Sequence, residues 1–207
     1  MIEFFFDCSS PWTYIAFRNI QPLAAALDEP ISWRPVLVGG IFNTVNKGIY
    51  ASREDMNAPK NRYMLKDVQD NAREYGLTLH FPPKVFPVNS VKAMRGCIWI
   101  AQDAAARAHY LPFIEATFAA YFTREEDISQ DDVLAAICRS VGIDADAFLA
   151  GIAQADIKEQ LKTNTDEAIR RGAFGAPTFF VGDDMYFGND RLPLVRSAVL
   201  RRRAANR

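Results

Sequence analysis

The stretch from Phe4 to Tyr14, with the sequence FFFDCSSPWTY, constrains the fold more than any other part of the chain. Its first three residues are phenylalanines, an apolar run typical of a short strand covered on both faces. Ser10 then stands directly before Pro11, and proline is favoured at the first position of a helix. The stretch therefore predicts a strand that turns directly into a helix, with Ser10 at the elbow.

Ser10 has two interpretations at such an elbow. Serine before a helix is an ordinary N-cap, and it can be a cap and nothing more. Alternatively, the first turn of the helix has unpaired N–H groups and the positive end of the helix dipole, which favour an anion beside the hydroxyl. The residues of the elbow alone leave both interpretations open.

The composition indicates a globular protein with a small-molecule partner. The chain has 207 residues, 49% hydrophobic and 24% charged, which is enough for a full core. A formal net charge of -1 argues against nucleic acid or an anionic membrane surface as the main partner. The chain has no apolar run of membrane-spanning length, and Glu3 and Asp7 stand where a signal peptide needs basic residues. We therefore expect a cytoplasmic protein without a membrane or nucleic-acid partner.

The cysteines and histidines do not form a recognisable disulfide or metal pattern. Cys8, Cys97 and Cys138 are widely spaced without a CxxC motif, which favours buried free thiols. His80 and His109 are far apart and lack neighbouring ligand residues, so we expect no metal site.

The first quarter of the chain predicts a βαβ unit followed by a long loop. Residues 12–27 have apolar side chains at helical spacing, and residues 31–38 form a second apolar run that suggests a parallel strand. Residues 39–59 are rich in Gly, Asn and Pro and lack periodicity, and loops of this length are usually functional. Asn46 and Lys47 are candidate functional residues there, with solvated loop residues as the alternative.

The rest of the chain predicts a helical middle and a return to sheet. Amphipathic helices are expected over residues 60–75, 91–105, 111–121, 127–141, 144–152 and 156–170. Residues 178–181 and 185–187 then predict a hairpin, followed by a last helix near Leu192 and a solvated basic tail over 201–207. We expect an α/β unit, about 1–59 and 172–207, with an all-helical insertion over about 60–171.

This order of elements, with a proline directly before the third strand, resembles the thioredoxin fold. In that fold a Cys-Pro-x-Cys motif often stands at the first elbow, and here Ser10-Pro11-Trp12-Thr13 places hydroxyls where both sulfurs would be. The chain resembles, more specifically, the branch of kappa-class glutathione transferases and 2-hydroxychromene-2-carboxylate isomerase. Its signatures stand here as Phe5, Asp7, Ser10, Pro11 and Tyr14 at one end, and as Phe174-Gly175-Ala176-Pro177-Thr178 and Phe187-Gly188-Asn189-Asp190-Arg191 at the other. Residues in matching order between them extend the resemblance over nearly the whole chain: Gly39-Gly40-Ile41-Phe42, Asn46, Lys60, Tyr63 and Phe86-Pro87-Val88-Asn89.

The resemblance implies glutathione as cofactor and assigns the site residues. Ser10 would be the catalytic residue that stabilises the glutathione thiolate. The residues implied in glutathione binding are Ala176, Pro177, Asn189, Asp190 and Asn46. Those implied in binding a small aromatic 2-hydroxy or 2-keto acid are Lys60, Tyr63, Asn89 and Trp12, with Lys60 as the partner of the substrate carboxylate. By the same resemblance we expect a cis bond between Ala176 and Pro177.

The resemblance implies an enzyme, and more than one activity fits it. One is an isomerase of aromatic catabolism. It would convert 2-hydroxychromene-2-carboxylate to a product of the trans-o-hydroxybenzylidenepyruvate type, and the reaction would proceed by reversible addition of the glutathione sulfur. Asn189 before Asp190 resembles the isomerase more than the kappa transferases, which usually have Ser there. A kappa-like transferase is the alternative; a thiol oxidoreductase relative lacking the cysteine pair and a non-catalytic binder are the others. A homodimer is compatible with the resemblance.

Overall fold

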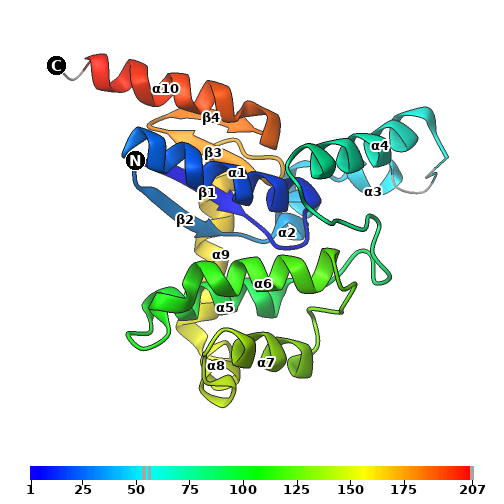
Figure 1. Ribbon diagram of the computed structural model, residues 1–207, viewed down its shortest axis with the longest axis vertical. Helices are drawn as coiled ribbons and strands as arrows, with labels where there is room; N and C mark the ends of the chain where they lie inside the picture. Colours follow the sequence, from blue (N-terminus) through cyan, green and yellow to red (C-terminus); the bar gives the residue numbers. More distant parts are fainter. Residues whose placement is uncertain (53–54, 56, 206–207) are drawn as a thin grey trace.

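The computed structural model describes residues 1–52, 55 and 57–205, and its arrangement is shown in Figure 1. The strands are β1 (Ile2–Phe6), β2 (Ile31–Pro35), β3 (Thr178–Val181) and β4 (Asp184–Phe187). The helices are α1 (Pro11–Leu27), α2 (Val38–Val45), α3 (Gly48–Ser52), α4 (Pro59–Glu74), α5 (Val91–Gln102), α6 (Tyr110–Phe122), α7 (Asp131–Ser140), α8 (Ala145–Gly151), α9 (Ala155–Arg170) and α10 (Leu192–Ala205). Two 3₁₀ turns, η1 (Arg107–His109) and η2 (Asn189–Arg191), precede α6 and α10.

The four strands form one mixed sheet in the order β2-β1-β3-β4. β1 and β2 are parallel, with Ile2 opposite Ile31, whereas β3 is antiparallel to both β1 and β4. A parallel pair joined through α1, followed after the helices by a hairpin and α10, is the βαβ and ββα order expected from the sequence. The predicted thioredoxin-like α/β fold is therefore confirmed.

Alternation along β1 supplies both faces of the sheet with aromatic side chains. Phe4 and Phe6 face α1 and α10, and Phe4 stacks on Phe179 with ring centroids 4.7 Å apart. Phe5 faces the opposite side, where it packs with Phe180 beneath α2 and α9. Because both faces are covered, the apolar run at the N-terminus needs no polar alternation (Figure 1).

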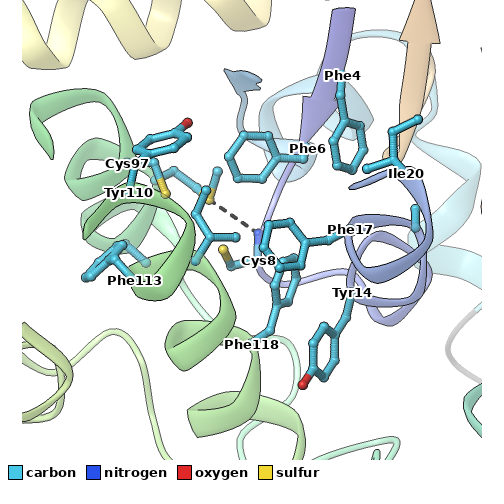
Figure 2. Close-up of a cluster of buried hydrophobic side chains, with 14 of the residues drawn as sticks. Phe4, Phe6, Cys8, Tyr14, Phe17, Ile20, Cys97, Tyr110, Phe113 and Phe118 are labelled. Atoms are coloured by element: carbon cyan, nitrogen blue, oxygen red, sulfur yellow. Dashed lines mark hydrogen bonds between the residues drawn. The ribbon is translucent and has the colours of Figure 1, made fainter. Parts of the chain in front are cut away.

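The helical middle of the chain shares a hydrophobic core with the sheet. Buried side chains of α5, α6, α7 and α8 belong to the same contiguous cluster as Phe4 and Phe6. Phe118 of α6 stacks on Tyr14 of α1 with a centroid distance of 4.8 Å, as Figure 2 illustrates. The expected insertion thus separates two parts of the sheet in sequence while packing continuously against them.

The expectation of a long loop over residues 39–59 is wrong, because α2 and α3 form within it. A Cβ on Gly40 would lie 3.3 Å from Cγ2 of Thr165 on α9, so this glycine permits close helix packing and does not mark a loop. Residues 53, 54 and 56 of that stretch lie outside the described residues.

Three helix or strand ends also differ from the expected bounds. β2 ends at Pro35, and α5 ends at Gln102 because the Asp103 carboxylate accepts the N–H groups of Ala105 and Ala106. α7 starts at Asp131, since Asp127 uses its side chain in a local turn that accepts the N–H of Ser129.

The tail expected over 201–207 is helical through Ala205, and Arg203 forms an ion pair with Glu29. Residues 206 and 207 of that tail lie outside the described residues. Within the described part of the chain, no helix has the length and apolar character to cross a bilayer.

The three cysteines are unpaired and buried, but two of them are neighbours. The sequence places Cys8 near the sheet and Cys97 in the helical middle, which predicts that they are apart. Instead both side chains lie in the same hydrophobic cluster, where the N–H of Cys8 donates to Sδ of Met94 at 3.3 Å (Figure 2). Burial, then the contact with Cys97, raises the pKa of the Cys8 thiol well above its usual range, and burial raises the pKa of Cys138 to about 12.

We expect the native protein to be inert toward thiol reagents near neutral pH, because all three thiols are buried and the reagent cannot reach them. In denaturant without reductant, a disulfide-exchange dye should release three equivalents of colour per chain. Release of one equivalent would show that two cysteines are joined and would contradict the expectation.

Candidate active site

A cavity of about 590 Å³ lies where the elbow after β1 meets the loop before β3. Five parts of the chain form its walls: the elbow, the α2 to α3 segment, α4, the loop before α5, and the loop before β3 with the end of β4. Its aromatic lining consists of Trp12, Phe42, Tyr50, Phe81, Phe86, Phe174 and Phe187. Its side-chain amides and hydroxyls, apart from the Tyr50 phenol, belong to Ser9, Ser10, Asn46, Asn61, Asn89 and Ser90. Among the described residues, none that lines the cavity carries a charge.

Ser10 is both a helix cap and a cavity residue. Its Oγ accepts the N–H of Thr13 at 3.2 Å, which is the N-cap contact of α1, and donates to the carbonyl of Ala176 at 3.0 Å. The side chain therefore connects the start of α1 to the loop before β3. The cap interpretation describes part of what Ser10 does, and its contact with Ala176 places the hydroxyl inside a site.

The loop before β3 has the conformation that the sequence predicts. The bond between Ala176 and Pro177 is cis, so that expectation is confirmed. The carbonyl of Pro177 accepts the N–H of Gly188 at 3.0 Å, which holds η2 beside the loop. Ala176 lines the cavity, whereas Pro177 is not among the lining residues.

Asn189 and Asp190 lie in η2, outside the cavity lining. Asn189 is buried, and its side-chain nitrogen donates to Oδ1 of Asn71 on α4 at 3.0 Å. Asp190 is exposed and forms an ion pair with Arg191. The hydrogen bond from Gly188 to Pro177 keeps both residues next to the site. Of the two side chains, only that of Asp190 is open to solvent.

Asn46, Asn89 and Trp12 all line the cavity, and hydrogen bonds orient both amides. The nitrogen of Asn46 donates to the carbonyl of Phe174 at 3.2 Å, so its oxygen is the atom that can accept from a ligand. Oδ1 of Asn89 accepts the N–H of Val91 at 3.1 Å, so its nitrogen is the atom that can donate.

Lys60 and Tyr63 are exposed and are not among the residues that line the cavity. Tyr63 has 65% of its surface exposed. Asn61 and Met64, one position further along α4 in each case, face the cavity instead. The sequence predicts the helix correctly, and the assignment of Lys60 and Tyr63 to substrate stays a prediction.

Asp7 is a structural residue of the site to which the sequence alone assigns no role. It is fully buried, and its two oxygens accept the N–H groups of Ser9 at 2.9 Å and Val38 at 2.8 Å. Burial raises the pKa of Asp7, and these hydrogen bonds oppose the rise. The sequence does contain a signal for this role, because Asp7 is an acidic residue directly after an apolar strand.

The chain matches a known protein family and several known enzymes in sequence. The family described as DSBA-like thioredoxin domain matches residues 1–200. The chain belongs to this family. Among known proteins, 2-hydroxychromene-2-carboxylate isomerase of Pseudomonas putida is 28% identical over 199 residues, 96% of this chain and 94% of that protein. Glutathione s-transferase kappa 2 of Caenorhabditis elegans is 27% identical over 206 residues, 94% of this chain and 89% of that protein.

Solved structures resemble this chain over nearly its whole length. A 2-hydroxychromene-2-carboxylate isomerase structure superimposes with a TM-score of 0.79 at 27% identity, covering 99% of this chain and 97% of that one. A probable DsbA oxidoreductase from Streptomyces coelicolor reaches 0.71 at 17% identity, covering 97% and 88%, and at that identity it shares the fold alone. The resemblance to the isomerase and kappa-transferase branch, expected from the signatures, is confirmed.

Proposed function

We propose that this protein is a glutathione-dependent enzyme that isomerises a conjugated aromatic compound, with 2-hydroxychromene-2-carboxylate as the first substrate to test. The observation that carries the proposal is the contact of Ser10 with the carbonyl of Ala176, directly before a cis proline and inside an aromatic cavity. The names of the relatives support the same reaction class.

The residues at the elbow fit the cysteinyl part of glutathione. The backbone of Ala176 offers a peptide edge at the cavity, and Ser10 offers a hydroxyl at the N-terminus of a 17-residue helix. A thiolate at this position is stabilised by the O–H donor and by the positive end of the helix dipole. When bound, glutathione supplies a sulfur that adds reversibly to the conjugated carbon, permits rotation about the former double bond, and leaves.

The contact between Ser10 and Ala176 suggests how the hydroxyl becomes available. In the unliganded chain the Ser10 proton is donated to the Ala176 carbonyl. A peptide ligand paired with Ala176 offers its own N–H to that carbonyl, and the two donors then compete for it. Ser10 can therefore turn its O–H toward the sulfur when the peptide is in place.

The remaining site residues have the following roles in this proposal. Asn46 offers an oxygen to a peptide N–H, and the exposed Asp190 offers a carboxylate to the γ-glutamyl ammonium. Trp12 and Asn89 belong to the substrate side of the cavity. Asn61 and Met64 take the places on α4 that the sequence assigned to Lys60 and Tyr63, and Asn189 acts through its support of η2.

A kappa-like transferase is the second candidate, because the same activated sulfur could leave with the substrate as an adduct. The names of the kappa relatives favour it. A thiol oxidoreductase has less support, since Ser10 and Thr13 carry oxygen where a redox pair needs sulfur. Cytoplasmic residence, which the sequence predicts, and a homodimer, which is compatible with the resemblance, remain part of the proposal.

The proposal is tested by following hydroxychromene carboxylate with and without glutathione. An isomerase should convert it only when glutathione is present and should leave the glutathione concentration unchanged. Stoichiometric loss of free thiol would favour the transferase. Turnover without glutathione, or no turnover of this compound and of simple conjugated electrophiles, would overturn the proposed function.

A further inference from the structure

A hydrogen bond between two amide side chains joins α4, one wall of the cavity, to the turn before α10. The side-chain nitrogen of Asn189 in η2 donates to Oδ1 of Asn71 at 3.0 Å, across 118 positions of the chain. The nitrogen of Asn71 donates to the carbonyl of Asp67, one helical turn earlier, at 2.8 Å. The helix itself therefore fixes the orientation of the Asn71 amide, and its oxygen is left to accept from Asn189.

Few buried side chains hold α4 to the rest of the protein. Of its 16 residues, all of which the structure describes, only Asn61, Val68 and Ala72 are buried. Val68 and Ala72 belong to the main hydrophobic cluster, whereas Asn61 lines the cavity near the other end of the helix. An element with few buried apolar contacts can shift at a small cost in free energy. The polar contact of Asn71 therefore contributes to the position of the whole helix, whose last turns lie nearest to the start of α10 (Figure 1).

The turn that carries Asn189 is connected in its own right to the loop before β3. The N–H of Gly188 donates to the carbonyl of Pro177 at 3.0 Å, next to the backbone of Ala176 that lines the cavity. Asn189 follows Gly188 directly and is buried, so the position of its amide depends on this turn. In the proposed function the peptide pairs with Ala176 and reaches Asp190. Glutathione would therefore bind on the same segment from which Asn189 contacts α4.

We propose that Asn71 is a positioning residue through which glutathione and the aromatic ligand bind cooperatively. The bound peptide holds η2 in place, and the amide of Asn189 then holds α4 through Asn71. The fixed helix presents Asn61 and Met64, which line the cavity, to the aromatic ligand. By linkage, the aromatic ligand raises the affinity for the peptide by the same factor. This inference rests on the proposed function, since it requires that the peptide binds beside η2.

The test measures the affinity for 2-naphthol, a flat aromatic ligand, with and without S-methylglutathione, a peptide without a reactive thiol. The coupling factor is the Kd of 2-naphthol for the free protein divided by its Kd for the peptide-saturated protein, both measured by calorimetry. We expect a factor of about 10 in the wild type, within the range typical of linked sites. In Asn71→Ala the factor should fall below about 2, because Asn189 then has no acceptor on α4. A ratio of this kind cancels any change that affects both affinities equally.

Two further variants separate this contact from general effects on folding. Asn189→Ala removes the same hydrogen bond from η2, and it serves as the test if Asn71→Ala does not fold. It should lower the coupling factor as Asn71→Ala does, and the double variant should lower it no further. Gln69→Ala is the matched control on α4, because its side-chain nitrogen donates to the carbonyl of Leu79 at 3.1 Å. This control removes one amide hydrogen bond from the same helix and should keep the wild-type factor.

Other results would overturn the inference or the proposed function. An equal coupling factor in the wild type and Asn71→Ala, or no coupling in the wild type, would overturn the inference and leave the proposed function intact. An equal loss of coupling in Gln69→Ala would assign the effect to a general loosening of α4 and would also overturn it. Absence of S-methylglutathione binding together with absence of glutathione-dependent turnover would overturn the proposed function, and the inference with it.

Discussion

Ser10→Ala is expected to lower glutathione-dependent turnover on the order of 100-fold, the usual loss when one preorganised donor to a developing charge is removed. Without the hydroxyl, the bound sulfur loses an O–H donor, so its pKa rises and less of it is ionised at neutral pH. The fold should lose about 1 to 2 kcal/mol, because the substitution removes the N-cap contact with Thr13 and the hydrogen bond to the carbonyl of Ala176.

The diagnostic measurement is the absorbance of bound thiolate as a function of pH. In the wild type the bound thiol should titrate below free glutathione, and in Ser10→Ala its pKa should move upward. Asp144→Ala is a matched control, since Asp144 caps α8 by accepting the N–H groups of Asp146 and Ala147 and is not among the cavity-lining residues. This control should lose similar stability and retain turnover. Identical titration curves and equal turnover in wild type and Ser10→Ala would reduce Ser10 to a helix cap.

The elbow between β1 and α1 could be predicted from the sequence, because the local residue preferences and the order of elements in the fold indicate the same structure there. An apolar strand, a serine and a proline specify strand, cap and helix start independently of the rest of the chain. The proline before β3 could be interpreted once that order was recognised. The placement of Ser10 opposite Ala176 then follows from the sheet, since β1 and β3 are neighbouring strands.

The substrate side of the site could not be predicted in the same way. On α4, Lys60 with Tyr63 and Asn61 with Met64 are both pairs three residues apart, so helical spacing places either pair on one face. Which pair faces the cavity depends on how α4 packs against other elements. Its weakly apolar sequence, with only Asn61, Val68 and Ala72 buried, gives little indication of that rotation.

Contacts between distant segments could not be predicted from the sequence for a related reason. Cys8 and Cys97 are 89 positions apart in the sequence and lie in one core cluster, and Asp7 accepts the N–H of Val38, which is 31 positions away. Such contacts depend on the assembled core. The residue type still carried a signal for Asp7, because an acid at the end of a buried strand needs hydrogen-bond donors around it.

Phe4→Ala is expected to lower the free energy of unfolding by about 3 to 5 kcal/mol, the range typical of a large aromatic side chain removed from a packed core. Phe4 is fully buried at the centre of the sheet, where its ring stacks on Phe179 and lies 5.6 Å from Phe6 and from Trp33. Removing it takes away apolar burial and leaves a cavity between β1, β2, β3 and α1. The rigid neighbouring rings cannot collapse into that space without leaving their own contacts.

Urea unfolding followed by tryptophan fluorescence measures this effect, because Trp33 is in contact with the removed ring. The midpoint should fall while the slope with urea stays constant, as for a change in native stability alone. Leu194→Ala, at an exposed apolar position of α10, is the matched control and should change the free energy of unfolding by about 0.5 kcal/mol or less. A loss below about 1 kcal/mol in Phe4→Ala would contradict the central position of this ring, because a side chain that fills the space between both strand partners and α1 cannot be removed at so small a cost.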